Sequence, residues 1–282
     1  MLLKEIDKPF DSKDYLFEVK FDGIRAIIFT NKEELIIRSR NKQDITHLFP
    51  ELQSIKKLVN DNVIFDGEIV AFENDKVSFS QIQKRLHLKN KDKINKIANE
   101  EPITFVAFDI LYKNKDITSN TLNDRKKILK KYNDTDVFIK AKSISTNGIK
   151  LFNSIKKLNL EGIVAKEKNG KYHINKRTDN FIKIKNIQRD EFIIGGFTEK
   201  KNGILSLAIG EMKDNLFYYV GKVSINNKTS IYEKIKNSKK SENYFCNFNE
   251  DIFYIKPTIH CHVEYLERTK QNNLRHPIFK DI

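Results

Sequence analysis

The segment 17–25 places three charged side chains on one face of a predicted strand. In an extended backbone, Glu18, Lys20 and Asp22 face one side and the apolar residues between them face the other, until Gly23 ends the run. Such a strand is poorly suited to a core and well suited to the floor of a reaction site. A lysine there could act as a nucleophile if burial or neighbouring cations lower its pKa, so that the free amine exists near neutral pH. An edge strand with a solvated polar face explains the segment equally well.

Two carboxylates interrupt the strongly apolar run 63–72. Asp66 and Glu68 are two residues apart and therefore lie on one face of the predicted strand. Burial of a carboxylate is costly unless it meets a metal, a cation or hydrogen-bond donors. The run is therefore a second candidate part of a site.

A further carboxylate, Glu161, enters the short apolar run 162–165, which ends at Lys166. Simple counting places Glu161 and Lys166 on opposite faces of a strand. Either Gly162 permits a bend, or Glu161 lies ahead of the strand.

The segment 181–185 alternates two lysines with two isoleucines. Lys183 and Lys185 therefore share one face of a predicted strand. Beside a reactive amine, two lysines would lower its pKa by charge repulsion and could also hold a phosphate.

Taken together, these segments resemble the motifs of ATP-dependent DNA ligases, which share the lysine nucleotidyltransferase superfamily with RNA ligases and capping guanylyltransferases. The order and spacing of the motifs match across nearly the whole chain. The matching segments are Lys20–Arg25, similar to the nucleophile motif KxDGxR, then Ser39–Asn41, Asp66–Glu68, Phe108–Asp109, Glu161–Lys166 and Lys183–Lys185. The chain looks closest to small bacterial ligases related to end-joining enzymes, whose closing motif is similar to residues 275–280.

The resemblance implies a role for each matching residue. Lys20 would attack the α-phosphate of ATP, form a lysine–AMP phosphoramidate and release pyrophosphate, with Mg²⁺ (or Mn²⁺) neutralising the phosphates. The implied nucleotide contacts are Glu18 and Phe108 at adenine, Glu68 at the ribose, Arg25 and Arg40 at ribose or phosphates, and Lys183 and Lys185 at the α-phosphate. The implied metal ligands are Glu68 and Glu161, and the implied DNA contacts are Arg40 and Lys166.

The closing motif implies a role for Arg275. In the resembled family the second domain swings over the nucleotide site. Arg275 would then meet the β- and γ-phosphates of ATP and orient pyrophosphate as the leaving group.

Two phenylalanines need separate comment. Phe181 stands where the family often has Trp, and the chain contains no Trp. Strict strand alternation groups Phe108 with Val106 and Ile110, so a purely structural phenylalanine is the alternative to an adenine contact.

The predicted elements favour two domains. In residues 1–186, strands and helices mix without regular alternation, which favours an antiparallel-rich α+β domain over a doubly wound sheet; the resemblance implies an ATP-grasp-like nucleotidyltransferase domain. Residues 187–282 contain about five short strands and one helix, as a small all-β OB-fold requires. Strands are predicted at 16–21, 26–30, 34–38, 63–72, 103–111, 162–165, 181–184, 192–196, 204–210, 216–223, 253–255 and 259–266. Helices are predicted at 51–59, 80–88, 122–132, 148–158 and 230–236, with a capping box at Thr121 and Asp124.

The composition favours a nucleic-acid partner and excludes several classes of protein. The 282 residues carry 52 Lys+Arg and 38 Asp+Glu, a net charge of +14, although a general lysine bias would also produce this excess. Residues 1–186 contain 37 of the 52 basic residues and 26 of the 38 acidic residues, so most of the positive excess lies in this part. No apolar run approaches the ~20 residues of a membrane span, and the N-terminal residues lack a signal-peptide core. Two cysteines cannot form a disulfide scaffold or a four-cysteine zinc site.

The sequence therefore predicts a cytoplasmic, monomeric ATP-dependent DNA ligase without a membrane partner. It would seal 5′-phosphate/3′-hydroxyl nicks in duplex DNA during repair, recombination or end joining, where an end-joining protein could be its partner. The alternatives are an RNA ligase or a capping-type nucleotidyltransferase, or a non-catalytic OB-fold protein that binds nucleic acid. The last alternative explains the charge but not the carboxylates within strands. The pathway, the recruiting partner and the preference between nicks and breaks stay open.

Overall fold

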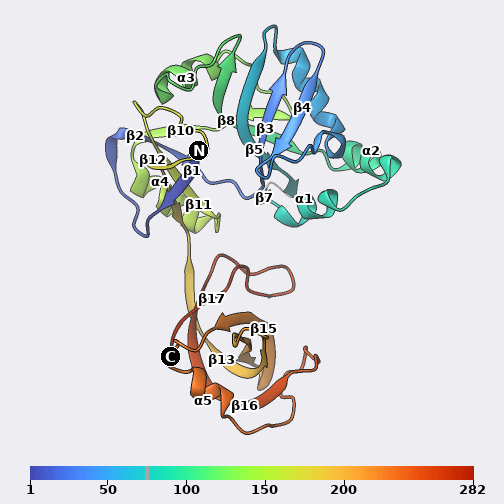
Figure 1. Cartoon of the computed structure of the whole chain (residues 1–282), viewed down its shortest axis with the longest axis vertical. Coiled ribbons are helices and arrows are strands. Elements are labelled where there is room, and N and C mark those ends of the chain that lie inside the picture. Colours follow the sequence, from blue (N-terminus) through green and yellow to red (C-terminus); the bar gives the residue numbers. More distant parts are fainter. Residues whose placement is uncertain (74–75) are drawn as a thin grey trace. The chain divides into compact units, whose positions relative to one another are not determined.

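The computed structural model describes residues 1–73 and 76–282 and divides into two compact units, Met1–Lys185 and Asn186–Ile282 (Figure 1). Each unit has its own hydrophobic core. No helix in the described part of the chain is long and apolar enough to cross a membrane. Antiparallel strands dominate both units, and the second contains one sheet and one short helix, which confirms the predicted fold class.

One five-stranded sheet of the first unit carries most of the predicted chemistry. Its order is β1-β12-β11-β2-β10, and only the β1–β12 pair is parallel among these neighbours. The strands are β1 (Leu2–Glu5), β2 (Ser12–Val19), β10 (Ser143–Thr146), β11 (Gly162–Glu167) and β12 (Arg177–Lys185). The sequence predicts β2, β11 and β12. It misses β1 and β10, because edge strands of four residues are too short to show an alternation.

The two faces of this sheet differ in character. On one face Phe17, Ile163 and Ile184 are buried and pack with Ile155 of helix α4 (Gly148–Lys157). The opposite face carries the charged side chains of the same strands. Alternation along each strand therefore separates a core from a site, as the sequence predicts.

The second sheet of the first unit supplies its largest core. Its order is β4-β3-β5-β8-β9, with strands β3 (Ile24–Thr30), β4 (Leu35–Ser39), β5 (Val63–Val70), β8 (Thr104–Lys113) and β9 (Phe138–Lys140). Leu52, Ile82 and Ile94 pack against it from η2 (Pro50–Leu58), α1 (Phe79–Leu86) and α2 (Lys91–Glu100). Shorter elements are η1 (Thr46–Leu48), β6 (Phe72–Glu73) and β7 (Lys76–Val77).

The segment predicted as a helix at 51–59 is a 3₁₀ helix, η2. Its apolar residues Leu52, Ile55 and Leu58 recur every three positions. That spacing matches the three residues per turn of a 3₁₀ helix, so one narrow stripe faces the core.

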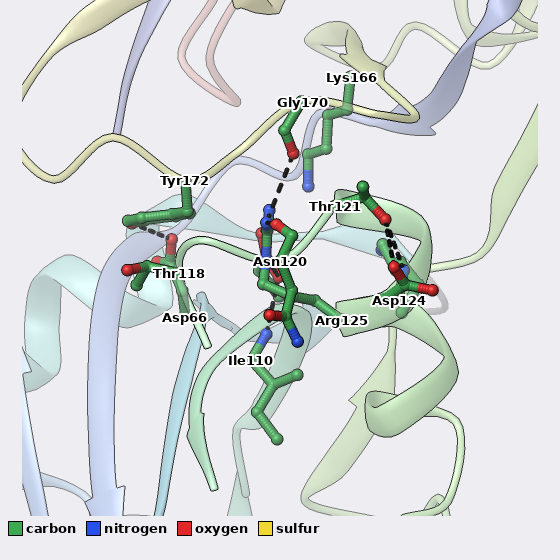
Figure 2. A network of polar contacts seen from close by, with 12 residues as sticks. Asp66, Ile110, Thr118, Asn120, Thr121, Asp124, Arg125, Lys166, Gly170 and Tyr172 are labelled. Carbon is green, nitrogen blue, oxygen red and sulfur yellow. Dashed lines mark hydrogen bonds and ion pairs between the residues drawn. The ribbon is translucent and has the colours of Figure 1, made fainter. Parts of the chain in front are cut away.

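Helix α3 (Leu122–Leu129) brings two charged residues to a buried position. It begins at Thr121, whose hydroxyl oxygen accepts from the backbone N–H of Asp124 at 3.2 Å, so the predicted cap is confirmed (Figure 2). Its inward face includes Arg125 and Lys126. Arg125 forms a fork with Asp109 of β8, at 2.8 and 2.9 Å, and both side chains are fully buried. This pair fixes α3 to the second sheet.

The second unit is a five-stranded antiparallel sheet of the OB type. Its order is β15-β14-β13-β16-β17, with β13 (Gln188–Glu199), β14 (Leu205–Lys213), β15 (Leu216–Ile225), β16 (Phe253–Tyr265), β17 (Ile278–Asp281) and helix α5 (Tyr232–Lys236). The prediction of separate strands at 253–255 and 259–266 is wrong, because both belong to β16. The register of β16 against β13 shifts between Ile194 and Gly196, and Pro257 lies in the bulge opposite, where no ladder N–H is required.

Candidate active site

A pocket opens on the charged face of the first sheet. It brings together residues from segments far apart in the chain, and six of the predicted site residues line it: Glu18, Lys20, Arg25, Glu68, Phe108 and Lys166. Leu3, Val164 and Phe181 also contribute to its wall. Glu18 and Lys20, which the sequence places on the floor of a reaction site, therefore line a concave surface.

Strand register aligns the charged residues in two rows. Val164 of β11 pairs with both Glu18 and Lys183, so these side chains share a face across three strands. In the next row Gly162 pairs with Lys185, and its carbonyl oxygen accepts from the backbone N–H of Lys20 at 2.9 Å. Both predicted phosphate lysines therefore lie on the face that carries Lys20.

The amine of Lys20 contacts the carboxylate of Glu161, with 2.7 Å between Nζ and oxygen. Glu161 directly precedes β11, so one of the two predicted explanations for its orientation is correct. Gly162 also has a φ of +150° and no room for a Cβ, which would lie 2.2 Å from the Ile184 carbonyl oxygen. The glycine thus permits the positive φ and the close packing of β11 on β12.

The second carboxylate beside Lys20 is Glu68. Burial raises the pKa of Glu68 to about 8, and the charge of Glu161 adds to this effect, although Lys20 and Arg25 oppose it. Burial and the neighbouring carboxylate therefore favour the neutral form of Glu68, and a bound cation would favour its charged form.

Glu18 is buried and held by three donors. Its carboxylate accepts from Lys126, from Lys166 at 2.7 Å and from the Ser143 hydroxyl at 2.6 Å. Burial alone would raise the pKa of Glu18, but the two lysines lower it to about 2. The carboxylate is therefore a fixed negative charge at one end of the pocket.

Lys166 lies in the wall of the pocket and not on an open surface. Its side chain is 4% exposed, and Nζ lies 4.4 Å from the centroid of the Phe108 ring and 5.3 Å from that of Phe181. Its ammonium group is engaged by Glu18. This geometry does not suit the predicted contact with a DNA backbone, because the charge is enclosed by the pocket.

A β-bulge turns Phe108 into the pocket. In the pairing of β5 with β8, Asp66 faces Asp109 and Gly67 faces Ala107, so Phe108 has no partner. Ile110 then points to the core, away from Phe108. Strict alternation, which groups Phe108 with Ile110, is wrong here because the extra residue resets the strand.

Arg25 of β3 is held by Asp66 of the neighbouring strand β5 and by Tyr172, which precedes β12. Its guanidinium donates to both carboxylate oxygens of Asp66, at 3.0 and 2.7 Å, and to the hydroxyl of Tyr172 at 3.1 Å. Tyr172 in turn donates to Asp66 at 2.7 Å, as Figure 2 shows. Burial alone would raise the pKa of Asp66, but Arg25 lowers it overall. Arg25 therefore has a structural task in addition to lining the pocket.

The two predicted phosphate lysines already share a partner. Lys183 and Lys185 contact separate oxygens of Glu5, at 2.8 and 2.9 Å. Glu5 belongs to β1 and no motif contains it.

Five predicted site residues are absent from the lining of this pocket. Glu161 contacts Lys20, and Lys183 and Lys185 lie on the same sheet face in β12. The other two lie elsewhere. Arg40 lines a neighbouring groove of about 700 Å³, together with Arg38 and Lys42, and Arg25 lines both hollows. Arg275 belongs to the second unit, where Nη1 contacts Glu267 at 2.9 Å.

Residues 2–185 match the family described as ATP dependent DNA ligase domain, and residues 200–282 match the ATP dependent DNA ligase C terminal region. The chain belongs to the ATP-dependent DNA ligase family. It is thus an ATP-using ligase, as the motifs predict, and the alternative of a non-catalytic OB-fold protein is not supported.

Individual relatives support the assignment of the chain to this family. The SPbeta prophage-derived DNA ligase-like protein LigB of Bacillus subtilis is 30% identical over 99% of this chain and 97% of its own length. The multifunctional non-homologous end joining protein LigD of Mycolicibacterium smegmatis is 28% identical over 97% of this chain. The ligase spans only 36% of that longer protein.

Solved structures share the fold of the ligase. The ligase domain of LigD from M. tuberculosis superimposes with a TM-score of 0.59 at 23% identity, over 99% of this chain and 93% of that one. A Lig E DNA ligase superimposes with a TM-score of 0.66 at 16% identity, over 100% and 99% of the two chains.

Three residues of the pocket region have no place in the motifs of the ligase. Lys126 and Ser143 hold Glu18, and Glu5 holds the two lysines of β12. Lys126 alone leaves a signal in the sequence. It lies four positions after Leu122 and three before Leu129, on the apolar stripe of a predicted helix, where a lysine needs a buried partner.

Proposed function

We propose that this ligase seals nicks in duplex DNA through an AMP group carried by Lys20. The supporting observation is that Lys20 Nζ lies in a pocket with a carboxylate at 2.7 Å, while two further lysines lie on the same sheet face in β12. The amine would attack the α-phosphorus of ATP, so that a P–N bond forms while the bond to pyrophosphate breaks. AMP would then pass to the 5′-phosphate of the nick, and the 3′-hydroxyl would expel it.

The remaining pocket residues would hold the nucleotide. Glu18 would accept from the adenine amino group, and Phe108 would stack on the ring, because both line the inner wall. Glu68 and Arg25 would contact the ribose or the phosphates. Lys183 and Lys185 would bind the α-phosphate from β12, on the sheet face that carries Lys20, as donors to the developing charge.

Lys166 is assigned a different role from the one the motif implies. Its ammonium group is buried between Glu18 and the Phe108 ring. We infer that it fixes Glu18 and the aromatic wall for the nucleotide and does not bind DNA.

The two carboxylates beside Lys20 suit a magnesium ion. No group of three or more His, Cys, Asp or Glu side chains that could hold a metal ion occurs within residues 1–73 and 76–282. Mg²⁺ commonly binds to one or two carboxylates plus substrate phosphates, and Glu68 and Glu161 supply two. When bound, Mg²⁺ would neutralise the phosphates and the carboxylates. The raised pKa of Glu68 is consistent with this need for positive charge.

The two domains would have different roles in the reaction. We assign adenylation to a domain of residues 1–186 and the OB-fold to residues 187–282. Arg275 of the second domain would contact the β- and γ-phosphates of ATP. Arg40, in a groove with Arg38 and Lys42, would contact the DNA backbone.

The biological setting is inferred from the relatives. LigD proteins are named for non-homologous end joining, and LigB is named as prophage-derived. We therefore propose a monomeric enzyme of DNA repair or end joining, acting in the cytoplasm with DNA and with an end-joining protein as partner. An RNA ligase activity is the second candidate, because the same lysine chemistry serves both substrates.

Intact-mass spectrometry tests the assignment of Lys20. After incubation with ATP and Mg²⁺, the wild-type ligase should gain one AMP, and Lys20→Ala should gain none. Lys13→Ala, an exposed lysine of β2, the strand that leads into Lys20, is the matched control and should gain AMP normally. Adenylation of the Lys20→Ala variant would show that another residue is the nucleophile. A panel of nicked DNA and nicked RNA then separates the two candidate substrates.

A further inference from the structure

We propose that Glu5, on the edge strand β1, is a built-in competitor for the phosphate site: its carboxylate holds Lys183 and Lys185 and must release them when the nucleotide α-phosphate binds. The inference rests on the proposed function of the two lysines as phosphate contacts. It gives Glu5 control over nucleotide affinity.

The backbone directs Glu5 towards the lysines. β1 runs parallel to β12, with Glu5 in register with Lys183. The pairing continues one residue further, because the backbone N–H of Ile6 donates to the Lys183 carbonyl oxygen at 3.2 Å. Glu5 Oε2 lies 2.8 Å from Lys183 Nζ, and Oε1 lies 2.9 Å from Lys185 Nζ. One carboxylate therefore bridges the pair, with one oxygen for each ammonium.

A phosphate would use the same two groups. Its two non-bridging oxygens present negative charge in much the same way as the two oxygens of a carboxylate. Glu5 left between the lysines would repel the incoming phosphate. The nucleotide therefore has to displace Glu5 and cannot simply add to it.

Exposure separates Glu5 from the other carboxylate that bridges two lysines. The side chain of Glu18 is 3% exposed, and its departure would leave Lys166 and Lys126 charged and enclosed. The side chain of Glu5 is 37% exposed, so rotation brings it directly into water. A half-exposed ion pair contributes little, which makes the exchange easy. Although burial opposes this, Lys183 and Lys185 lower the pKa of Glu5, so the carboxylate is charged at neutral pH.

The test is nucleotide affinity in the full chain. The probe is AMPCPP, an ATP analogue with a methylene bridge between the α- and β-phosphorus, titrated with Mg²⁺ present; adenosine, which has no phosphate, is the comparison ligand. Glu5→Gln should bind AMPCPP about three-fold more tightly, the effect expected when one weak competing ion pair is removed. Adenosine affinity should stay unchanged, because the lysines do not contact the nucleoside.

A matched control excludes a general charge effect. Asp179→Asn removes the same charge from an ion pair between β12 and Lys4 of β1, and it should leave AMPCPP affinity unchanged. If Glu5→Gln melts at a lower temperature than the wild type, Glu5→Thr, which suits an edge strand, replaces it. Unchanged or weaker AMPCPP binding by a folded Glu5 variant overturns the proposal, because Glu5 then does not compete or even organises the lysines.

The double variant Lys183→Ala, Lys185→Ala separates this outcome from failure of the proposed function. If the double variant binds AMPCPP as well as the wild type does, the lysines are not phosphate contacts and the site assignment itself is wrong. If it binds AMPCPP weakly while Glu5→Gln has no effect, the lysines keep their role and only the competition is refuted.

Discussion

The amine of Lys20 and the carboxylate of Glu161 lie 2.7 Å apart although 141 positions separate them in the chain. The contact exists because β2 and β11 pair antiparallel, with Ile163 opposite Val19. It places an acidic group within reach of the proposed nucleophile from the start of a neighbouring strand.

Glu161→Ala should slow nick sealing by about 10²-fold or more, because a group aligned with the reacting amine and the metal is lost. Glu167→Ala, at the other end of β11, is the control and should seal normally. Sealing rates and melting temperatures are measured on the same preparations. A variant that melts early but keeps its activity per folded molecule would show that Glu161 is only structural.

Glu68 should make stability depend on pH. Its pKa is raised from 4.5 in the unfolded chain to about 8, so between these values the folded protein binds the extra proton. Stability must therefore fall as pH rises through this window. Glu68→Gln removes the penalty and should melt about 3 °C higher than the wild type at pH 8.5, with a smaller difference at pH 5.

Added Mg²⁺ should reverse this difference. The ion binds the charged carboxylate, so it should raise the melting temperature of the wild type at pH 8.5 more than that of Glu68→Gln. An equal response of the two proteins would remove Glu68 from the proposed metal site.

Asp109→Ala should destabilise the first unit by about 3–5 kcal/mol, because it leaves the guanidinium of Arg125 buried without its partner. Lys127→Ala, which breaks the exposed pair with Asp124 on the same helix, should cost far less, because solvent screens that pair. Urea denaturation followed by a signal from the first unit measures both. Equal costs for the two variants would contradict the burial of the Asp109 pair.

Lys166→Met should weaken nucleotide binding, whereas Arg40→Ala should weaken DNA binding. Loss of the buried ammonium should weaken AMPCPP binding about tenfold, since one charge-assisted contact to Glu18 is lost. Affinity for nicked DNA should stay unchanged. Arg40→Ala should instead weaken DNA binding and lower its salt dependence by about one ion, without effect on the nucleotide. DNA binding that falls with Lys166→Met would restore the role implied by the motif.

Arg275→Ala should impair self-adenylation and spare later steps. Only the attack on ATP releases pyrophosphate, so a contact to the β- and γ-phosphates matters in that step alone. A nick that already carries AMP should still be sealed at close to the wild-type rate. Arg189→Ala, which breaks an exposed pair with Asp281 in the same unit, is the control. Equal loss in both assays would indicate misfolding of the second unit.

Much of the pocket is predictable because strand alternation is a local property. The charges of Glu18, Lys183 and Lys185 fall on one face, as counting by two requires. The family resemblance supplies their roles. The grouping of these strands in one sheet depends on long-range pairing, which local patterns do not reveal.

The features that the sequence does not predict arise from breaks in periodicity or from distant partners. The bulge at Phe108 shifts the alternation of β8 by one residue, and no residue type in the strand indicates the bulge. Ser143 reaches Glu18 from a four-residue edge strand. Glu5 reaches Lys183 only because β1 is parallel to β12, a pairing between the two ends of the first unit.

The bulge that turns Phe108 inward also makes this position suitable for a fluorescence probe. The chain contains no tryptophan, and Phe108 lines the pocket beside Lys166. Phe108→Trp would therefore place the single indole of the protein against the proposed adenine position. Its fluorescence would report on nucleotide binding without a label and without background from any other tryptophan.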